Sequence, residues 1–195
     1  MNEITNNEMV FVLKIFKSPE IEYNANSIAK EIGISSMGAL KIAKRLEKEN
    51  IISSKELGKA KFYSLNLESD YVKQYIKFLL KREAEQSHPY VKIWIEDIKK
   101  VKNVEAAILF GSILRKGKQA KDIDVLFIVK DKRQFSKLKK EIEDINLLHT
   151  KKIHPMFQTE EDFRNNIKKQ DKPLLSAIKG IVVFGEDGIM GLMQK

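Results

Sequence analysis

The 195-residue sequence contains no cysteine, so neither a disulfide framework nor a thiolate metal site can form in it. It also has no apolar run long enough to cross a membrane, and its first residues, rich in asparagine and glutamate, show no signal-peptide pattern. Internal repeats and low-complexity linkers are missing as well. These absences predict a soluble protein of the reducing cytoplasm, with no membrane partner.

What the sequence has instead is a surplus of positive charge. It holds 36 Lys and Arg against 27 Asp and Glu, a formal net charge of +9. Residues 1–66 contain ten basic and eight acidic residues, so they carry +2 and the rest of the chain carries +7. The surplus favours a polyanionic partner, either nucleic acid or nucleotide phosphate. An equally good explanation is a solvated surface rich in lysine and glutamate that binds no such partner.

The first third of the chain predicts three helices followed by a hairpin. Apolar residues recur at helical spacing, the second helix ends at Gly33, and Ser35 or Ser36 caps the third. Two strand patterns follow in residues 51–65, on either side of a glycine turn. This order of elements is that of a winged helix-turn-helix, which we place at residues 1–66.

In such a domain the third helix reads double-stranded DNA. Its N-terminal residues meet base edges in the major groove, its later basic residues meet phosphate, and the hairpin forms a wing along the backbone. The predicted DNA-binding residues on helix and wing are Ser36, Met37, Lys41, Lys44, Arg45, Lys48, Lys59 and Lys61. The alternative is a winged helix used only for protein contacts, which the near-neutral charge of residues 1–66 favours.

From residue 67 the pattern changes. We expect a connector helix, or dimerisation element, at residues 67–87, followed by a second domain at residues 88–195 in which strands and helices alternate. The strand patterns of this domain lie at residues 106–110, 123–129, 153–157 and 181–184. The fold class expected for the chain is therefore α/β (or α+β).

Two aspartates open the most apolar strand pattern. Asp122 and Asp124 alternate with apolar residues, so both carboxylates project from one face of the strand. Two like charges at that spacing repel each other unless a cation neutralises them. Mg²⁺ is usually held by one or two carboxylates together with substrate phosphates. The pair therefore predicts a metal site, and the alternative for this pattern taken by itself is a capped loop before the strand.

Residues that suit phosphate lie between the first two strand patterns of this domain. Gly111 allows close backbone approach, and the Ser112 hydroxyl with nearby amides can hold a terminal phosphate. Arg115 and Lys121 lie on the following loop, where their cations can meet phosphate charge. These four residues are the candidate nucleotide-binding residues.

Gly111-Ser112, the nine-residue gap and Asp122-x-Asp124 resemble the signature of the DNA polymerase β-like nucleotidyltransferases, particularly their minimal prokaryotic members. The resemblance covers residues 88–195 and implies a small mixed sheet flanked by helices. It also implies that the two aspartates coordinate two Mg²⁺ ions and that the Gly-Ser pair contacts the triphosphate of an NTP, with ATP expected. The implied reaction moves a nucleoside monophosphate to a hydroxyl with loss of pyrophosphate.

The family usually supplies a third carboxylate from a later strand. Here that strand pattern contains no acid, and His154 is its best-placed polar residue. Either His154 stands in as a catalytic residue, or the transferase activity is weak or lost. A structural role for His154 beside Pro155 is equally compatible with the sequence.

The sequence leaves three functions open. The first is a DNA-binding transcriptional regulator, acting as a homodimer, whose second domain senses or modifies Mg-NTP. The second is an active nucleotidyltransferase with a protein or small-molecule acceptor, since minimal relatives often act as antitoxins towards HEPN-domain toxins. The third is a nucleotide-binding or purely interacting pseudoenzyme. We favour the first.

Overall fold

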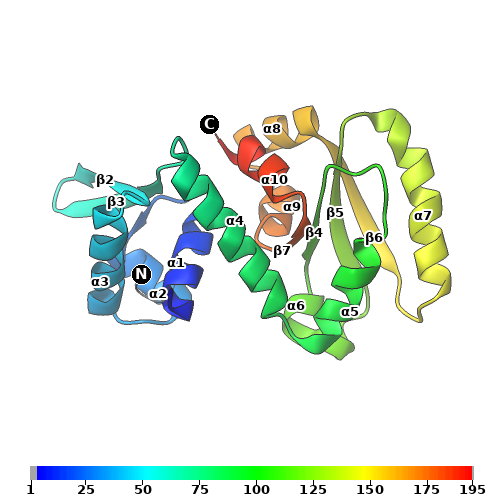
Figure 1. Cartoon of the computed structure of the whole chain (residues 1–195), viewed down its shortest axis with the longest axis horizontal. Helices are drawn as coiled ribbons and strands as arrows, with labels where there is room; N and C mark the ends of the chain where they lie inside the picture. Colours follow the sequence, from blue (N-terminus) through cyan, green and yellow to red (C-terminus); the bar gives the residue numbers. More distant parts are fainter. Residues whose placement is uncertain (1–3, 195) are drawn as a thin grey trace. The chain divides into compact units, whose positions relative to one another are not determined.

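The computed structural model describes residues 4–194 (Figure 1). The chain divides into two compact units within α4 (Asp70–Glu85), one ending at Leu79 and the other beginning at Leu80. The domain limits expected from the sequence, at residues 66 and 87, remain predictions. No helix within residues 4–194 is long and apolar enough to cross a membrane.

The N-terminal unit combines three helices with a small antiparallel sheet of strand order β1-β3-β2. Its elements are α1 (Asn6–Phe16), β1 (Tyr23–Asn24), α2 (Ala25–Ile32), α3 (Ser36–Lys48), β2 (Ile52–Leu57) and β3 (Ala60–Leu65). Gly33 ends α2 in the left-handed conformation, with φ of 72°. Of the two serines expected to cap the next helix, Ser35 does so, because its side chain accepts a hydrogen bond from the Gly38 amide at 3.0 Å.

The C-terminal unit is built on a four-stranded mixed sheet of order β6-β5-β4-β7 (Figure 1). Strands β4 and β5 are antiparallel, β5 and β6 are parallel, and β7 pairs antiparallel with β4. The strands are β4 (Ala106–Phe110), β5 (Ile123–Val129), β6 (Ile153–Thr159) and β7 (Ile181–Phe184). The helices are α5 (Pro89–Ile98), α6 (Ile113–Lys116), α7 (Phe135–Leu147), α8 (Glu160–Lys168), α9 (Lys172–Ala177) and α10 (Glu186–Met193), with 3₁₀ turns η1 (Gly117–Gln119) and η2 (Lys132–Gln134).

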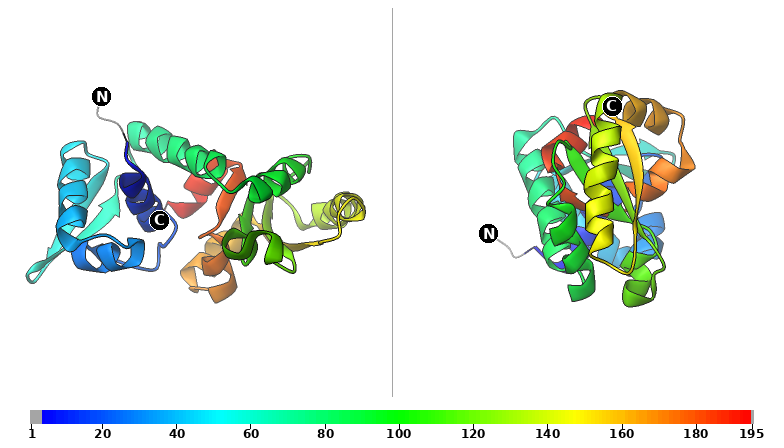
Figure 2. Two further views of the ribbon diagram at one scale, coloured as in Figure 1. Left: turned by 90° about the horizontal axis from the view of Figure 1, so that it is seen from below. Right: turned by 90° about the vertical axis from the view of Figure 1, so that its right-hand side faces the viewer.

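Helices cover both faces of this sheet. The left view of Figure 2 shows α5 and the orange helices α8 and α9 on opposite sides of the strands. On one face, Ile123 and Phe127 of β5 pack in a core with α5 and α7. Because side chains alternate along a strand, Asp122 and Asp124 lie on the other face. The chain is therefore a mixed α/β protein with a winged helix-turn-helix followed by a small mixed sheet flanked by helices, which confirms the predicted fold class.

Candidate functional site

The two aspartates lie where one strand ends and two others begin. In the antiparallel pair, Phe110 at the end of β4 stands opposite Asp124. In the parallel pair, His154 near the start of β6 stands beside Asp124. The sheet therefore gathers Gly111, Asp122, Asp124 and His154 at one edge, although they come from three separate segments of sequence.

Gly111 lies directly against the Asp124 side chain. Its φ is 81°, and a Cβ built on it would stand 2.1 Å from Asp124 Oδ2. No other residue fits there, because a side chain would meet both a strained backbone and a carboxylate. The sequence predicts that the Gly111 backbone lies close to a neighbouring group. In the described residues, that group is the Asp124 side chain.

His154 lies on the same side as the two carboxylates. Its Nε2 is 3.7 Å from Asp122 Oδ1, and the two side chains are 59 % and 47 % exposed. A protonated imidazole at this distance forms an ion pair with Asp122, while a neutral one does not. The exposure of both groups means that water screens any charge interaction between them.

The residues predicted to hold phosphate lie just beyond β4. Ser112 precedes the single turn of α6. In the described residues its side chain makes no hydrogen bond that caps this helix. Its carbonyl instead accepts hydrogen bonds from the amides of Arg115 and Lys116, at 3.1 and 2.8 Å. Arg115 and Lys121 are exposed, as cations that meet a ligand from solvent must be.

Sequence reasoning missed Lys151, which precedes β6. Its ammonium donates hydrogen bonds to the backbone carbonyls of Lys118 and of Ala120, the latter at 2.6 Å. It also lies 5.3 Å from the centre of the Tyr90 ring. These contacts join three segments that are remote from one another in sequence, and one lysine among many gives no sequence signal for them.

The donor set fits a hard divalent cation only in part. Two carboxylates suit Mg²⁺, whereas the imidazole of His154 is a nitrogen donor better suited to softer metals. Across the part of the chain that the structure describes, no group of three or more histidine and acidic side chains is arranged to hold a metal ion. A metal ion held by Asp122 and Asp124 would therefore need further ligands, such as the oxygens of a bound phosphate.

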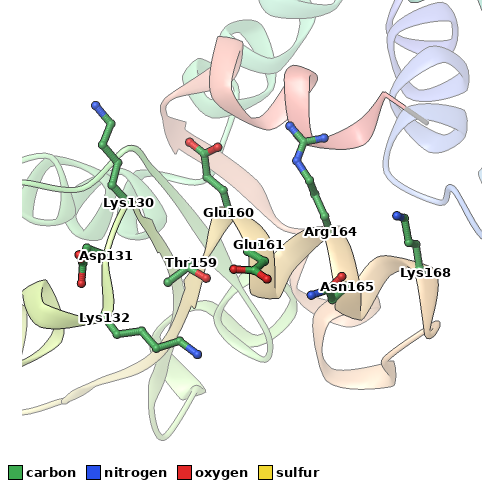
Figure 3. A pocket seen from close by; sticks show the side chains of 9 residues that line it. All are labelled: Lys130, Asp131, Lys132, Thr159, Glu160, Glu161, Arg164, Asn165 and Lys168. Carbon is green, nitrogen blue, oxygen red and sulfur yellow. The ribbon is translucent and has the colours of Figure 1, made fainter.

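An open pocket of about 790 Å³ lies at the opposite ends of β5 and β6 (Figure 3). Its lining residues are Lys130, Asp131, Lys132, Thr159, Glu160, Glu161, Arg164, Asn165 and Lys168. Four cations and three acids nearly cancel there, which does not favour a strongly charged ligand. None of the predicted site residues lines this pocket.

The predicted DNA-binding residues of α3 form one exposed row. Ser36 and Met37 lie in its first turn, and Met37 is 63 % exposed. Lys41, Lys44 and Lys48 follow at intervals of three and four, so they share one face of the helix. In the wing, the exposed Lys59 lies at the turn, while the exposed Lys61 pairs with Glu56 at 3.5 Å.

Arg45 differs from these lysines because acidic side chains engage its guanidinium. Nη1 lies 2.6 Å from Glu8 Oε1, and Nε lies 3.1 Å from Glu49 Oε1. The hydrogen bond to Glu49 raises the pKa of Arg45, although burial opposes the shift. Glu8 is only 3 % exposed, so the pair ties α3 to α1 inside the unit. Arg45 stays a predicted phosphate contact, but in this state it is already occupied.

Residues 94–180 match the model of the family described as polymerase beta, nucleotidyltransferase. This segment includes Gly111, Ser112, both aspartates and His154. The C-terminal unit is accordingly a nucleotidyltransferase domain of the polymerase β type, fused to the winged helix-turn-helix. The resemblance given by the sequence motif is thereby confirmed.

Some solved structures resemble the chain distantly. The adhesin competence repressor AdcR of Streptococcus pyogenes is 14 % identical, with 50 % of this chain and 68 % of that chain covered and a TM-score of 0.38. ZitR of Lactococcus lactis, a zinc-responsive MarR family member, is 14 % identical, with coverages of 51 % and 74 % and a TM-score of 0.31. Similarity this low does not bear on function. No curated protein matches the sequence.

Proposed function

We propose that this protein is a cytoplasmic DNA-binding transcriptional regulator, acting as a homodimer, whose nucleotidyltransferase domain binds Mg-NTP. The proposed binding of Mg-NTP rests on the position of His154. This residue lies on the strand from which the family supplies a third carboxylate, and its Nε2 is 3.7 Å from Asp122 Oδ1. With two carboxylates the site keeps the ligands for a nucleotide-bound Mg²⁺. Without a third acid it lacks a group to assist attack by a hydroxyl, which supports binding over turnover.

In this proposal each residue has a separate task. Asp122 and Asp124 hold Mg²⁺, which neutralises the phosphate charge of the nucleotide when bound. The backbone at Gly111 and the Ser112 hydroxyl approach the triphosphate, and Arg115 with Lys121 neutralises its outer oxygens. ATP is the expected nucleotide.

The test of this part is calorimetry with ATP and Mg²⁺, combined with a measurement of ATP consumption. Binding without turnover is the expected result, and the variant D122N D124N should lose it because both charged ligands become neutral amides. A matched control is D131N, which neutralises an acid at the far end of β5. If D122N D124N binds Mg-ATP as well as the unaltered chain, the proposed site is wrong.

For the DNA-binding part, the exposed row on α3 enters the major groove with Ser36 and Met37 near base edges. Lys41, Lys44 and Lys48 meet phosphate, and Lys59 and Lys61 of the wing follow the backbone. The test is binding to a duplex from the protein's own promoter at several salt concentrations. The variant K41A K44A should weaken binding and reduce the salt slope by about two. The control K139A K140A removes the same charge from α7 and should change neither quantity.

A second candidate function is nucleotidyl transfer itself. The intact contact between Gly111 and Asp124, and the two carboxylates on one face, favour it. The acceptor would be a protein or small-molecule hydroxyl; a HEPN-domain toxin as acceptor rests on family resemblance alone. Incubation with labelled NTPs, Mg²⁺ and a cell extract tests this function. Labelling that persists in D122A D124A would exclude this site as its source.

A further inference from the structure

The Lys151 side chain is bound in an unusual way for a lysine. Its ammonium donates to two backbone carbonyls of one short segment, those of Lys118 and Ala120, and lies near the face of Tyr90. In the part of the chain that the structure describes, no carboxylate pairs with it. Carbonyl dipoles and an aromatic face therefore compensate for the partial loss of hydration of this charge.

The segment that Lys151 holds leads directly into the site. Residues 117–121 connect α6, which carries Arg115, to Asp122 at the start of β5. Ala120 is 2 % exposed, and its carbonyl is one of the two that Lys151 binds. Asp122 thus follows the anchored residue by only two positions.

A second anchor lies on the other side of Asp122. The Ile123 amide donates to the carbonyl of Lys152 at 3.0 Å, which begins the pairing of β5 with β6. The side chain of Lys151 and the backbone of Lys152 therefore hold the chain before and after Asp122. Between these two anchors the backbone at Asp122 has little freedom to move.

We propose that Lys151 is a positioning residue for the metal-nucleotide site, an inference that rests on the proposed binding of Mg-NTP. Its described contacts are with the carbonyls of Lys118 and Ala120 and with the Tyr90 ring, and they include neither carboxylate. By fixing residues 117–121 it holds Asp122 in place and keeps Arg115 and Lys121 on the side from which the phosphates approach. Loss of the ammonium frees this segment, so its amides exchange faster and Mg-ATP binds more weakly.

The absence of cysteine from the chain allows a direct test. In the variant K151C the new thiol is the only one, so bromoethylamine converts it alone to an aminoethyl thioether that restores an ammonium at nearly the same length. Iodoacetamide gives a neutral adduct of similar size. Hydrogen exchange of residues 117–122 and calorimetry with Mg-ATP are then measured on all three forms.

The expected result is that K151C and its neutral adduct exchange at residues 117–122 about tenfold faster or more, with Mg-ATP affinity about tenfold lower, because two charge-assisted hydrogen bonds are lost. Aminoethylation should restore both. The matched control is K152C with the same treatments, because the Lys152 ammonium donates to the carbonyls of Asn146 and His149 and not to residues 117–121. Neither measurement should change by more than about twofold there.

The two readouts separate this inference from the proposed function. Slow exchange at residues 117–122 in K151C overturns the inference, whatever the affinity for Mg-ATP. Fast exchange with unchanged affinity overturns the positioning role. Failure of the unaltered chain to bind Mg-ATP contradicts the proposed function, while fast exchange reversed by aminoethylation still establishes the anchor. If K151C does not fold, Y90L removes the ring alone and should move both readouts the same way by a smaller factor.

Discussion

Gly111 shows at the residue scale how tightly the site is built. The variant G111A should lose Mg-ATP binding, because a Cβ would stand 2.1 Å from Asp124 Oδ2 and push the carboxylate aside. We expect it to lower the free energy of unfolding by about 1–3 kcal/mol, from backbone strain and the clash together. The control G58A also has positive φ, at 62°, but a Cβ there meets no described atom within 4 Å. It should cost only about 1 kcal/mol and leave Mg-ATP binding intact. Calorimetry and urea unfolding measure both effects.

The pair of Arg45 and Glu8 gives a second prediction at this scale. The variant R45M leaves the buried Glu8 carboxylate without its cation and should lower the free energy of unfolding by about 2–4 kcal/mol. The double variant E8Q R45M should recover a substantial part of this loss, since no charge then remains to be solvated. Denaturant unfolding of the two variants provides the comparison. Full stability in R45M combined with lost DNA binding would instead identify Arg45 as a phosphate contact.

Tyr75 on α4 makes the N-terminal unit sensitive to alkaline pH. Burial, assisted by the negative charge of Glu8, raises the pKa of Tyr75 to about 12. An unfolded chain ionises tyrosine near its ordinary pKa of about 10, so the stabilisation is complete below pH 10 and is lost as the pH rises through 12. The variant Y75F has no such proton and should lose less stability than the unaltered chain between these pH values. Parallel unfolding curves for both proteins in this range would contradict the assignment.

At the scale of elements, hydrophobic pattern predicts the strands well and the turns around the site poorly. The patterns at 106–110, 123–129 and 181–184 coincide with β4, β5 and β7. Strand β6 runs on to Thr159, two residues beyond its pattern, because pairing with β5 supports polar residues at that end. Helix α10 gives little signal because Gly188 and Gly191 lower its helix propensity, while burial of Ile189 and Met190 holds it in place.

The sequence predicts a loop between β4 and β5, whereas the structure has the helical turns α6 and η1 there. Tertiary contacts explain this difference. Apart from Ile113 and Leu114 its residues are polar or glycine and show no helical period, so propensity cannot predict it. The hydrogen bonds from Lys151 supply the missing stabilisation from outside the segment. The common face of the two carboxylates could be predicted because spacing along a single strand determines it. The anchor could not, because it depends on how separate elements meet.

The register of β5 and β6 indicates where a third carboxylate could be introduced. Parallel pairing puts His154 beside Asp124, so H154D would present a third carboxylate at the same edge. We expect H154D to strengthen Mg²⁺ binding by about tenfold, or ~1.4 kcal/mol, because a third hard oxygen ligand is added to the two carboxylates. The control H154N has the same size and no charge and should give no gain. Equal Mg²⁺ affinity in the two variants would show that position 154 faces away from the metal.

At the scale of the whole molecule, the regulator proposal requires the two domains to influence one another. Mg-ATP should change the affinity for operator DNA by a factor of roughly 5–150, and DNA must change the affinity for Mg-ATP by the same factor. Titrations of each ligand with and without the other measure both factors. In the variant D122N D124N, Mg-ATP should not change the affinity for DNA. If the unaltered chain also shows no change, the two domains bind independently.

The mixed directions of the central sheet also set an order of assembly. Strands β4 and β5 need only residues 111–122 to turn back on one another, whereas β6 must wait for residues 130–152 and β7 closes across residues 111–180. Short closures cost less chain entropy and form sooner. During refolding, Gly111 should therefore reach Asp124 before His154 arrives, so that the chain passes through a stage with paired carboxylates and no neighbouring imidazole. Pulsed hydrogen exchange should detect protection of β4 and β5 ahead of β6.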